Sequence, residues 1–119
     1  MDQFEELENR CIEFGVRIVK LAKSMYQGDP IDHHLAIQVL RSGTAPAAHY
    51  AEAKSAESKA DFLHKMRLAT KETNETVNWL NIIGSSEIVS MESLSGLIDE
   101  GIQLKKIFGA SITTARKSD

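Results

Sequence analysis

The chain has 119 residues, of which 42% are hydrophobic and 26% charged, which fits one globular domain rather than a disordered or fibrous chain. Its formal net charge of -3 argues against a protein built mainly to neutralise nucleic-acid phosphates. No run approaches the roughly 18 apolar residues of a membrane-spanning helix, and the acidic start MDQFEELE is unlike a secretory or transit peptide. We therefore expect a cytoplasmic protein without a membrane partner.

The first predicted helix spans residues 3–26, where apolar residues recur every three or four positions. The stripe consists of Phe4, Leu7, Cys11, Phe14, Ile18, Leu21 and Met25. Ile12, Val16 and Val19 widen the stripe on one side, which predicts a second neighbour, either within the bundle or across a subunit contact. Cys11 is the single cysteine; it cannot form an intramolecular disulfide, and we expect it to be a buried, inert thiol.

The second predicted helix spans residues 31–53. Gly28 suits a left-handed cap for the helix before it, and Asp29 and Pro30 suit the start of this one. The helix is rich in Ala, Gly, Ser and Thr, so we expect it deep in the bundle, because small side chains let helix backbones approach closely. Pro46 lies inside the pattern and predicts a kink, with a break of the helix as the alternative.

The third and fourth predicted helices span residues 58–83 and 91–114. Ser58 and Asp61 form an S-x-x-D capping box at the start of the third helix, and the Gly84-Ser85-Ser86 stretch is expected to end it. The residues after the fourth helix are expected to fray. Four helices with short connections predict a single all-α domain over residues 1–119, an antiparallel up-down-up-down four-helix bundle.

The middle of the chain carries three motifs that resemble a known family: an Arg-Ser-x-Thr run ending in Tyr-x-Glu-Ala, a Ser-x-x-Asp-Phe helix start, and a Lys-Glu-x-x-Glu-Thr-x-x-Trp-Leu run. The matching residues are Gln38, Leu40, Arg41, Ser42, Thr44, Ala48, Tyr50, Glu52, Ala53, Ser58, Asp61, Phe62, Lys71, Glu72, Glu75, Thr76, Trp79 and Leu80. The family is that of the four-helix bundle proteins named after open reading frames in bacterial 23S rRNA intervening sequences. The resemblance implies a bundle that assembles into a ring-like homo-oligomer, most often a pentamer, with no known reaction.

Three positions depart from the pattern of the family that this chain resembles. Pro46 stands where the family prefers a β-branched residue, His49 replaces the usual Asn, and Ala51 replaces a frequent Arg. Whatever the family does with that Asn-Tyr-Arg surface is therefore not carried over to this chain.

Arg41 with Glu72 and Glu75 is the most suggestive polar group. The two glutamates are three residues apart and share one side of the third helix, and Arg41 lies on the helix expected to pack against it. One interpretation is a charged site at the bundle surface or a subunit contact. The other, which we favour, is an inter-helix ion pair that fixes register and adds little net stability.

Metal binding and catalysis find no support in the sequence. Di-iron bundles need Glu-x-x-His motifs on two helices, whereas the comparable spacing here is Asp61-x-x-His64 on one helix. No nucleophile motif and no phosphate-binding glycine loop occurs, and a helix directs the adjacent Asp99 and Glu100 apart, so we interpret them as a solvated face. We predict no catalytic residue, no metal site and no cofactor.

The charge distribution suggests a second kind of surface. Acids dominate residues 1–14 and 72–104, whereas residues 54–71 carry five bases against Glu57 and Asp61. These candidate nucleic-acid contacts are Lys54, Lys59, Lys65, Arg67 and Lys71. The alternative is that this basic zone pairs with an acidic zone of a neighbouring subunit, which the overall negative charge favours.

These observations together predict a non-enzymatic, homo-oligomeric, ring-like scaffold or interaction protein, with a pentamer favoured. Its first partner is therefore a second copy of itself, and a protein partner is the next candidate. The alternative function is a nucleic-acid-binding accessory protein that uses the basic residues of the third helix.

Overall fold

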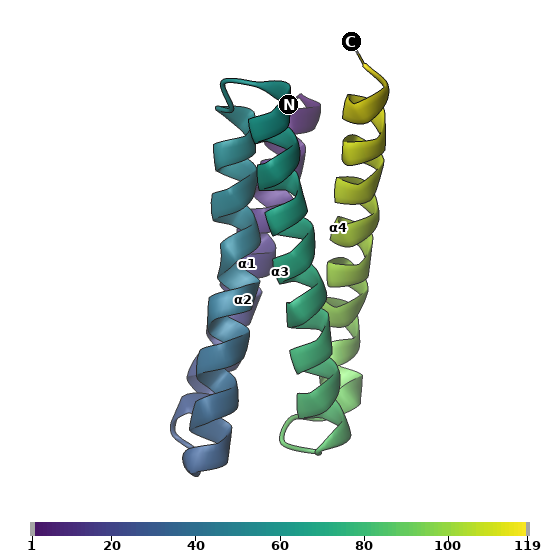
Figure 1. The fold of residues 1–119 in the computed structure, drawn as a ribbon. Helices are drawn as coiled ribbons and strands as arrows, with labels where there is room; N and C mark the ends of the chain where they lie inside the picture. Colours follow the sequence, from purple (N-terminus) through teal and green to yellow (C-terminus); the bar gives the residue numbers. More distant parts are fainter. Residues whose placement is uncertain (1, 119) are drawn as a thin grey trace.

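The computed structural model describes residues 2–118, which form four α-helices. They are α1 (Gln3–Tyr26), α2 (Pro30–Lys54), α3 (Lys59–Ser85) and α4 (Met91–Lys117). The helices run alternately in opposite directions, so the two termini and the α2–α3 turn lie at one end (Figure 1). Each helix packs along the next one in the chain. The predicted all-α antiparallel four-helix bundle is confirmed.

Each helix begins at a polar side chain that caps its free backbone N–H groups. The Asp29 carboxylate accepts hydrogen bonds from the backbone N–H of Ile31 and of Asp32, both at 2.9 Å, and Pro30 follows as the first helical residue. The other three caps, Asp2, Ser58 and Ser90, each accept from the N–H three residues on. These starts rest on local chemistry that the sequence carries.

Two helix ends differ from the sequence predictions. None of the glycines within residues 2–118 has a positive φ, so the predicted left-handed cap at Gly28 is wrong, and α1 is instead capped by Gln27. A Cβ added at Gly28 would lie 2.2 Å from a carboxylate oxygen of Asp32, so this position is kept small by the start of α2. The fourth helix is longer than predicted, because α4 continues to Lys117 and not only to about residue 114.

The end of α3 is a Schellman motif built on a glutamate rather than a glycine. Glu87 has a φ of 62°, and its N–H bonds to the carbonyl of Gly84 at 3.1 Å, while the N–H of Ile88 bonds to the carbonyl of Ile83 at 3.2 Å. Gly84 itself lies inside the helix, where a Cβ would be 2.6 Å from the Cε of Met91. Its role is to admit the first turn of α4.

Pro46 lies in the middle of α2 without ending it. The helix runs unbroken from Pro30 to Lys54 (Figure 1), so the alternative of a break at this proline is wrong. The Pro46 ring is fully buried, which replaces the missing backbone hydrogen bond with apolar packing.

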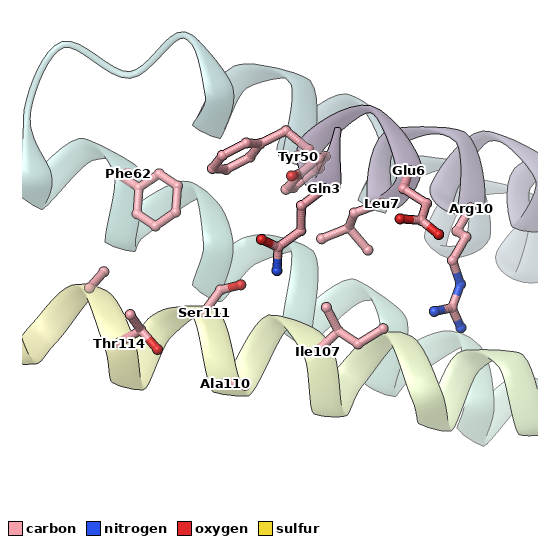
Figure 2. Close-up of a pocket in the computed structure, with 12 residues that line it drawn as sticks. Gln3, Glu6, Leu7, Arg10, Tyr50, Phe62, Ile107, Ala110, Ser111 and Thr114 are labelled. Carbon is pink, nitrogen blue, oxygen red and sulfur yellow. The ribbon is translucent and has the colours of Figure 1, made fainter. Parts of the chain in front are cut away.

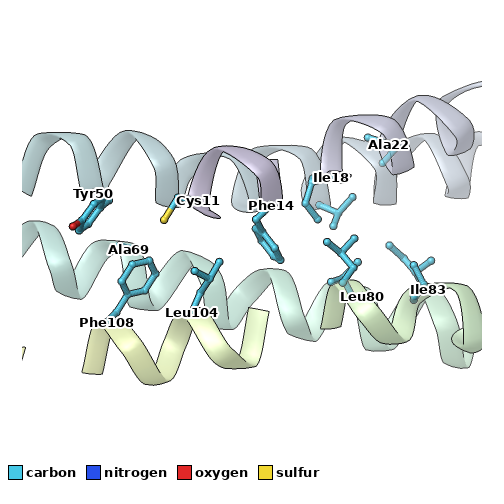
Figure 3. Close-up of a cluster of buried hydrophobic side chains, with 14 of the residues drawn as sticks. Cys11, Phe14, Ile18, Ala22, Tyr50, Ala69, Leu80, Ile83, Leu104 and Phe108 are labelled. Carbon is cyan, nitrogen blue, oxygen red and sulfur yellow. The ribbon is translucent and has the colours of Figure 1, made fainter. Parts of the chain in front are cut away.

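The core runs along the whole axis of the bundle and draws on all four helices (Figure 3). Its fully buried side chains include Phe14 and Ile18 from α1, Leu80 from α3 and Phe108 from α4. Cys11 belongs to this core with no exposed surface, and burial raises the pKa of its thiol to about 12. The thiol is therefore protonated at neutral pH and unreactive.

Glycines set how closely the sequential helices approach. A Cβ at Gly43 of α2 would lie 2.7 Å from both γ-carbons of Ile18 in α1, and a Cβ at Gly101 of α4 would lie 2.8 Å from Cγ2 of Val77 in α3. In contrast, α1 and α4 approach each other at few points. The bundle is thus closely packed along three seams and open along the fourth.

Candidate functional site

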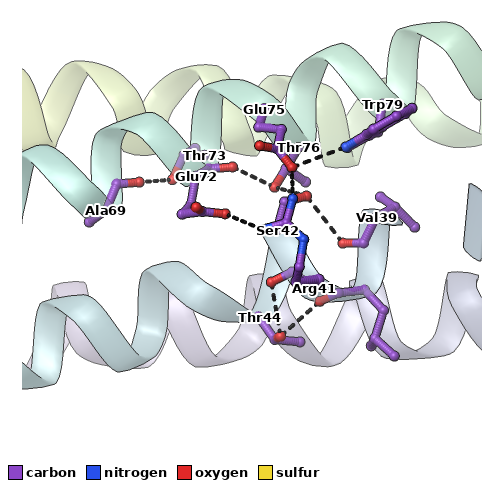
Figure 4. Close-up of polar contacts among 11 residues, drawn as sticks. Val39, Arg41, Ser42, Thr44, Ala69, Glu72, Thr73, Glu75, Thr76 and Trp79 are labelled. Atoms are coloured by element: carbon purple, nitrogen blue, oxygen red, sulfur yellow. Dashed lines mark hydrogen bonds and ion pairs between the residues drawn. The ribbon is translucent and has the colours of Figure 1, made fainter. Parts of the chain in front are cut away.

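The predicted polar cluster is assembled across the α2–α3 seam (Figure 4). Arg41 of α2 donates from Nη1 to Oε2 of Glu72 at 3.2 Å and from Nη2 to Oε2 of Glu75. The indole N–H of Trp79 donates to the same Glu75 oxygen at 3.2 Å. The structure therefore brings Arg41, Glu72 and Glu75 together and adds Trp79, which sequence reasoning did not place in this cluster. The signal for Trp79 was its position one turn after Glu75.

Beneath this cluster lies a buried pair of hydroxyl groups. The Oγ of Ser42 and the Oγ1 of Thr76 are hydrogen-bonded at 2.9 Å, and neither residue has exposed surface. Thr76 Oγ1 also lies 2.8 Å from the carbonyl of Glu72, and Thr73 donates to the carbonyl of Ala69 at 2.8 Å. The Ser42–Thr76 bond joins the two helices and favours this register of α2 against α3, because sliding either helix would break it, whereas the bonds of Thr73 and Thr76 to carbonyls of α3 would remain.

The Arg41 cluster presents a paired charge at the surface of the bundle. Both carboxylates already face the guanidinium. The Arg41 side chain is 52% exposed, whereas Glu72 is 15% exposed. Such a half-exposed pair contributes little to stability, but it leaves one face of the guanidinium open to a partner.

The five bases proposed as nucleic-acid contacts do not form one patch. Lys54 bonds to Glu8 of α1 at 3.0 Å, and Lys65 lies 3.7 Å from Glu52 of α2. Lys59 donates to the carbonyl of Ser118 at the end of α4. These three lysines are therefore spread over three seams of the bundle and are engaged there.

Arg67 and Lys71, the other two of the five bases, are exposed on one face of α3. They are one turn apart, and within residues 2–118 neither has an ion-pair partner. One turn further on, Asn74 accepts a hydrogen bond from Lys105 of α4 at 2.8 Å, which brings a third base to this face. Sequence reasoning missed Lys105, because only the packing of α4 on α3 places it there.

A second surface is apolar and covers the outer side of α1 and α2. Gly15 of α1 packs against Gly43 and Thr44 of α2, and this register sets the exposed apolar residues of the two helices side by side. We call it the α1–α2 apolar face; its members and their exposed fractions are Ile12 48%, Val16 40%, Val19 38%, Ile37 45% and Leu40 37%. The sequence had marked the three residues of α1 as a second apolar flank.

A third feature is a groove in the open seam between α1 and α4 (Figure 2). Its volume is about 550 Å³, with Leu7 of α1 facing Ile107 of α4 across it. The groove ends at an ion pair in which Arg10 donates from Nε and Nη2 to the two carboxylate oxygens of Glu100 at 3.0 and 2.7 Å. This bond raises the pKa of the Arg10 guanidinium. Our interpretation of Glu100 as part of a solvated face is therefore wrong.

The His, Cys, Asp and Glu side chains within residues 2–118 form no group of three or more that could hold a metal ion. None of the four helices is long and apolar enough to cross a membrane.

Comparison with known proteins agrees with the motifs in the middle of the chain. The model of the 23S rRNA-intervening sequence protein family matches residues 5–110. The chain belongs to this family. Its fold is also similar to the crystal structure of a protein of unknown function from the S23 ribosomal protein family of Bacteroides thetaiotaomicron, with a TM-score of 0.87 and 31% identity over 94% of this chain and 99% of that one. No curated protein matches the sequence.

Proposed function

We propose that this member of the 23S rRNA-intervening sequence protein family is a non-enzymatic scaffold that assembles with copies of itself through the α1–α2 apolar face. Five copies in a ring are the expectation from the family resemblance. The observation that carries the proposal is that five exposed large apolar side chains lie on the neighbouring helices α1 and α2, along the seam where Gly15 packs against Gly43. Single exposed apolar residues are ordinary, but a continuous patch marks an interaction surface.

The geometry of this face fits a helix-to-helix subunit contact. Ile12, Val16 and Val19 follow the spacing of one helix stripe, and Ile37 and Leu40 continue it on α2, so a neighbouring helix pair would find ridges to pack against. Closed point-group symmetry is the rule for soluble homo-oligomers, and a ring of such subunits would present the Arg41 cluster once per copy. Repeated weak contacts of that kind gain by avidity.

The test is native mass spectrometry of the untagged protein purified gently from a lysate. We expect one oligomeric mass for the wild type, and a monomer with unchanged helical circular dichroism for Val16→Glu and for Leu40→Glu, because a buried charge disrupts an apolar contact. Ile82→Glu is the matched control, since Ile82 is also an exposed isoleucine but lies on α3; it should stay oligomeric. A monomeric wild type at micromolar concentration contradicts the proposal.

A second candidate function is nucleic-acid binding through Arg67, Lys71 and Lys105. The observation that favours it is that, within residues 2–118, neither Arg67 nor Lys71 makes an ion pair. The same spectra decide it: co-purified oligonucleotide would appear as added mass that falls steeply with salt. That mass should be lost in the Arg67→Glu/Lys71→Glu variant and kept in Lys54→Glu, because Lys54 is engaged by Glu8. Clean protein mass at low salt counts against this function.

A further inference from the structure

The α1–α4 groove lies outside both proposed functions, and it has the properties of a docking site. It adjoins a second hollow of about 490 Å³ that reaches the α2–α3 turn, and Phe4 and Phe62 line both. The two hollows share these two phenylalanines near the end of the bundle that holds the termini (Figure 1), and we call the two adjoining hollows together the channel. We propose that this channel binds a basic amphipathic helix of a partner protein.

The shape of the groove follows from a mismatch in side-chain size. Along its α4 wall stand Ala110, Ser111, Thr114 and Ala115, and these small side chains do not fill the space in front of α1. A helix that inserts larger apolar side chains would complete the packing that this seam lacks, in the helix-in-groove mode of peptide recognition. In the closely packed seams of this bundle, small residues let two helices approach each other. In the groove no helix approaches the small side chains of α4, so space remains there for a ligand.

The lining combines apolar surface with hydrogen-bonding groups that have room for a ligand. Phe4 is 55% exposed, although a phenylalanine gains most by burial. Tyr50 lies at the base of the groove, and no group within residues 2–118 hydrogen-bonds its hydroxyl. Since every fully buried side-chain polar atom in that range has a partner, the hydroxyl must open onto the groove. Gln3 of α1 and Ser111 of α4 also line the groove (Figure 2).

The charges along the channel select a basic partner. Of the lining cations, Arg10 is bonded to Glu100 and Lys54 to Glu8. The lining acids Glu5 and Glu6 have no ion-pair partner within residues 2–118. Among the described lining residues, Glu5 and Glu6 are therefore left without an ion pair, whereas both lining cations are paired. Lysine or arginine on the flanks of a docked helix would pair with these acids. The attraction between the opposite charges would also raise the rate at which the helix binds.

The test uses two labelled synthetic peptides of about 18 residues, long enough to form a helix on binding. Both carry leucines at the same helical spacing, and one has lysines and the other glutamates on the polar face. Fluorescence anisotropy should show binding of the lysine peptide at least tenfold tighter than that of the glutamate peptide. Glu5→Gln/Glu6→Gln should reduce this preference. Because acids in a first turn also stabilise the helix itself, the charge preference is read from the peptides as well as from the variant.

Substitutions that fill the groove test whether the peptide binds there. Ser111→Trp places a large ring in the groove and should weaken the lysine peptide at least tenfold, with Ala110→Trp as a second variant if the first folds poorly. Thr113→Trp is the matched control, since Thr113 is an exposed residue of the same helix outside the groove. Equal loss in Thr113→Trp, or equal binding of both peptides, overturns the proposal. Native mass spectra of Ser111→Trp distinguish a partner helix in the groove from a second copy of this chain. An altered number of copies would assign the groove to a contact between copies and would overturn the proposal.

Discussion

At the scale of single residues, the buried hydroxyls of Ser42 and Thr76 carry a cost if either loses its partner. Thr76→Val keeps the shape but removes the 2.9 Å partner of Ser42 and leaves its hydroxyl the long 3.5 Å bond to the carbonyl of Val39, so we expect it to lower the free energy of unfolding by about 1–3 kcal/mol. The double variant Ser42→Ala/Thr76→Val should lose less than the sum of the two single changes, because no hydroxyl is then left unpaired. Urea denaturation of the four proteins measures this coupling, and additive losses would contradict it.

Only some of the residue contacts in the candidate site could be predicted from the sequence. Arg41, Glu72 and Glu75 could be grouped in advance, because helical spacing and antiparallel packing already set them on facing sides. The partners of Lys54, Lys65 and Glu100 could not, since each pairs with a residue whose position depends on the rotation of another helix. The same reason explains why the five predicted bases look like one patch in the sequence and separate in the structure.

At the scale of elements, two glycines of similar helical setting should respond in opposite directions to alanine. Gly43→Ala would drive a Cβ to 2.7 Å from Ile18, a buried β-branched side chain that cannot turn away. We expect a net loss of about 1–2 kcal/mol from overpacking. Gly109→Ala meets nothing within 4 Å and should gain about 0.5–1 kcal/mol from helix propensity. Urea midpoints measure both.

A Gly43→Ala protein as stable as the wild type would show that α1 and α2 can separate at little cost. If Gly109→Ala also failed to stabilise the protein, the end of α4 would not behave as an ordinary exposed helix.

The starts and ends of the elements were unequally predictable. The starts at Asp29 and Ser58 follow from a side chain that bonds its own backbone. The ends depend on neighbours: Gly28 meets the side chain of Asp32, Gly84 meets α4, and the left-handed position falls on Glu87. A glycine that follows an apolar stripe can therefore mark a place where another segment of the chain approaches closely, and not only the end of a helix.

At the scale of the whole molecule, two buried groups predict a loss of stability in alkali. Burial raises the pKa of Cys11 from 9.0 to about 12 and that of Tyr50 from 10.0 to about 12. As pH rises through this range, the unfolded chain loses these protons before the folded one does, so the free energy of unfolding falls between about pH 9 and 12. Tyr50→Phe should reduce that slope, and Tyr26→Phe should not, because the Tyr26 ring is half exposed.

Chemical denaturation at several pH values gives the slope directly. An unchanged slope in Tyr50→Phe would mean that the Tyr50 hydroxyl ionises in the folded state as easily as in the unfolded one, through its opening onto the groove.

The architecture as a whole was predictable because the three-four apolar spacing recurs in each long segment and the connections are short. The open seam was not. It depends on the sizes of side chains on α1 and α4, which lie at opposite ends of the sequence, and no local pattern records that Ala110, Ser111 and Ala115 would line a groove beside α1.

Because extensive packing joins only helices that follow one another in the chain, this molecule suits synthesis from one end. The α1–α2 hairpin can form once about half of the chain has left the ribosome, and each later helix then adds to a surface that already exists. Contacts between distant parts of a chain slow folding, and here few are needed. The last helix to be made packs along α3 and contacts the first helix at few points, among them the Arg10–Glu100 ion pair.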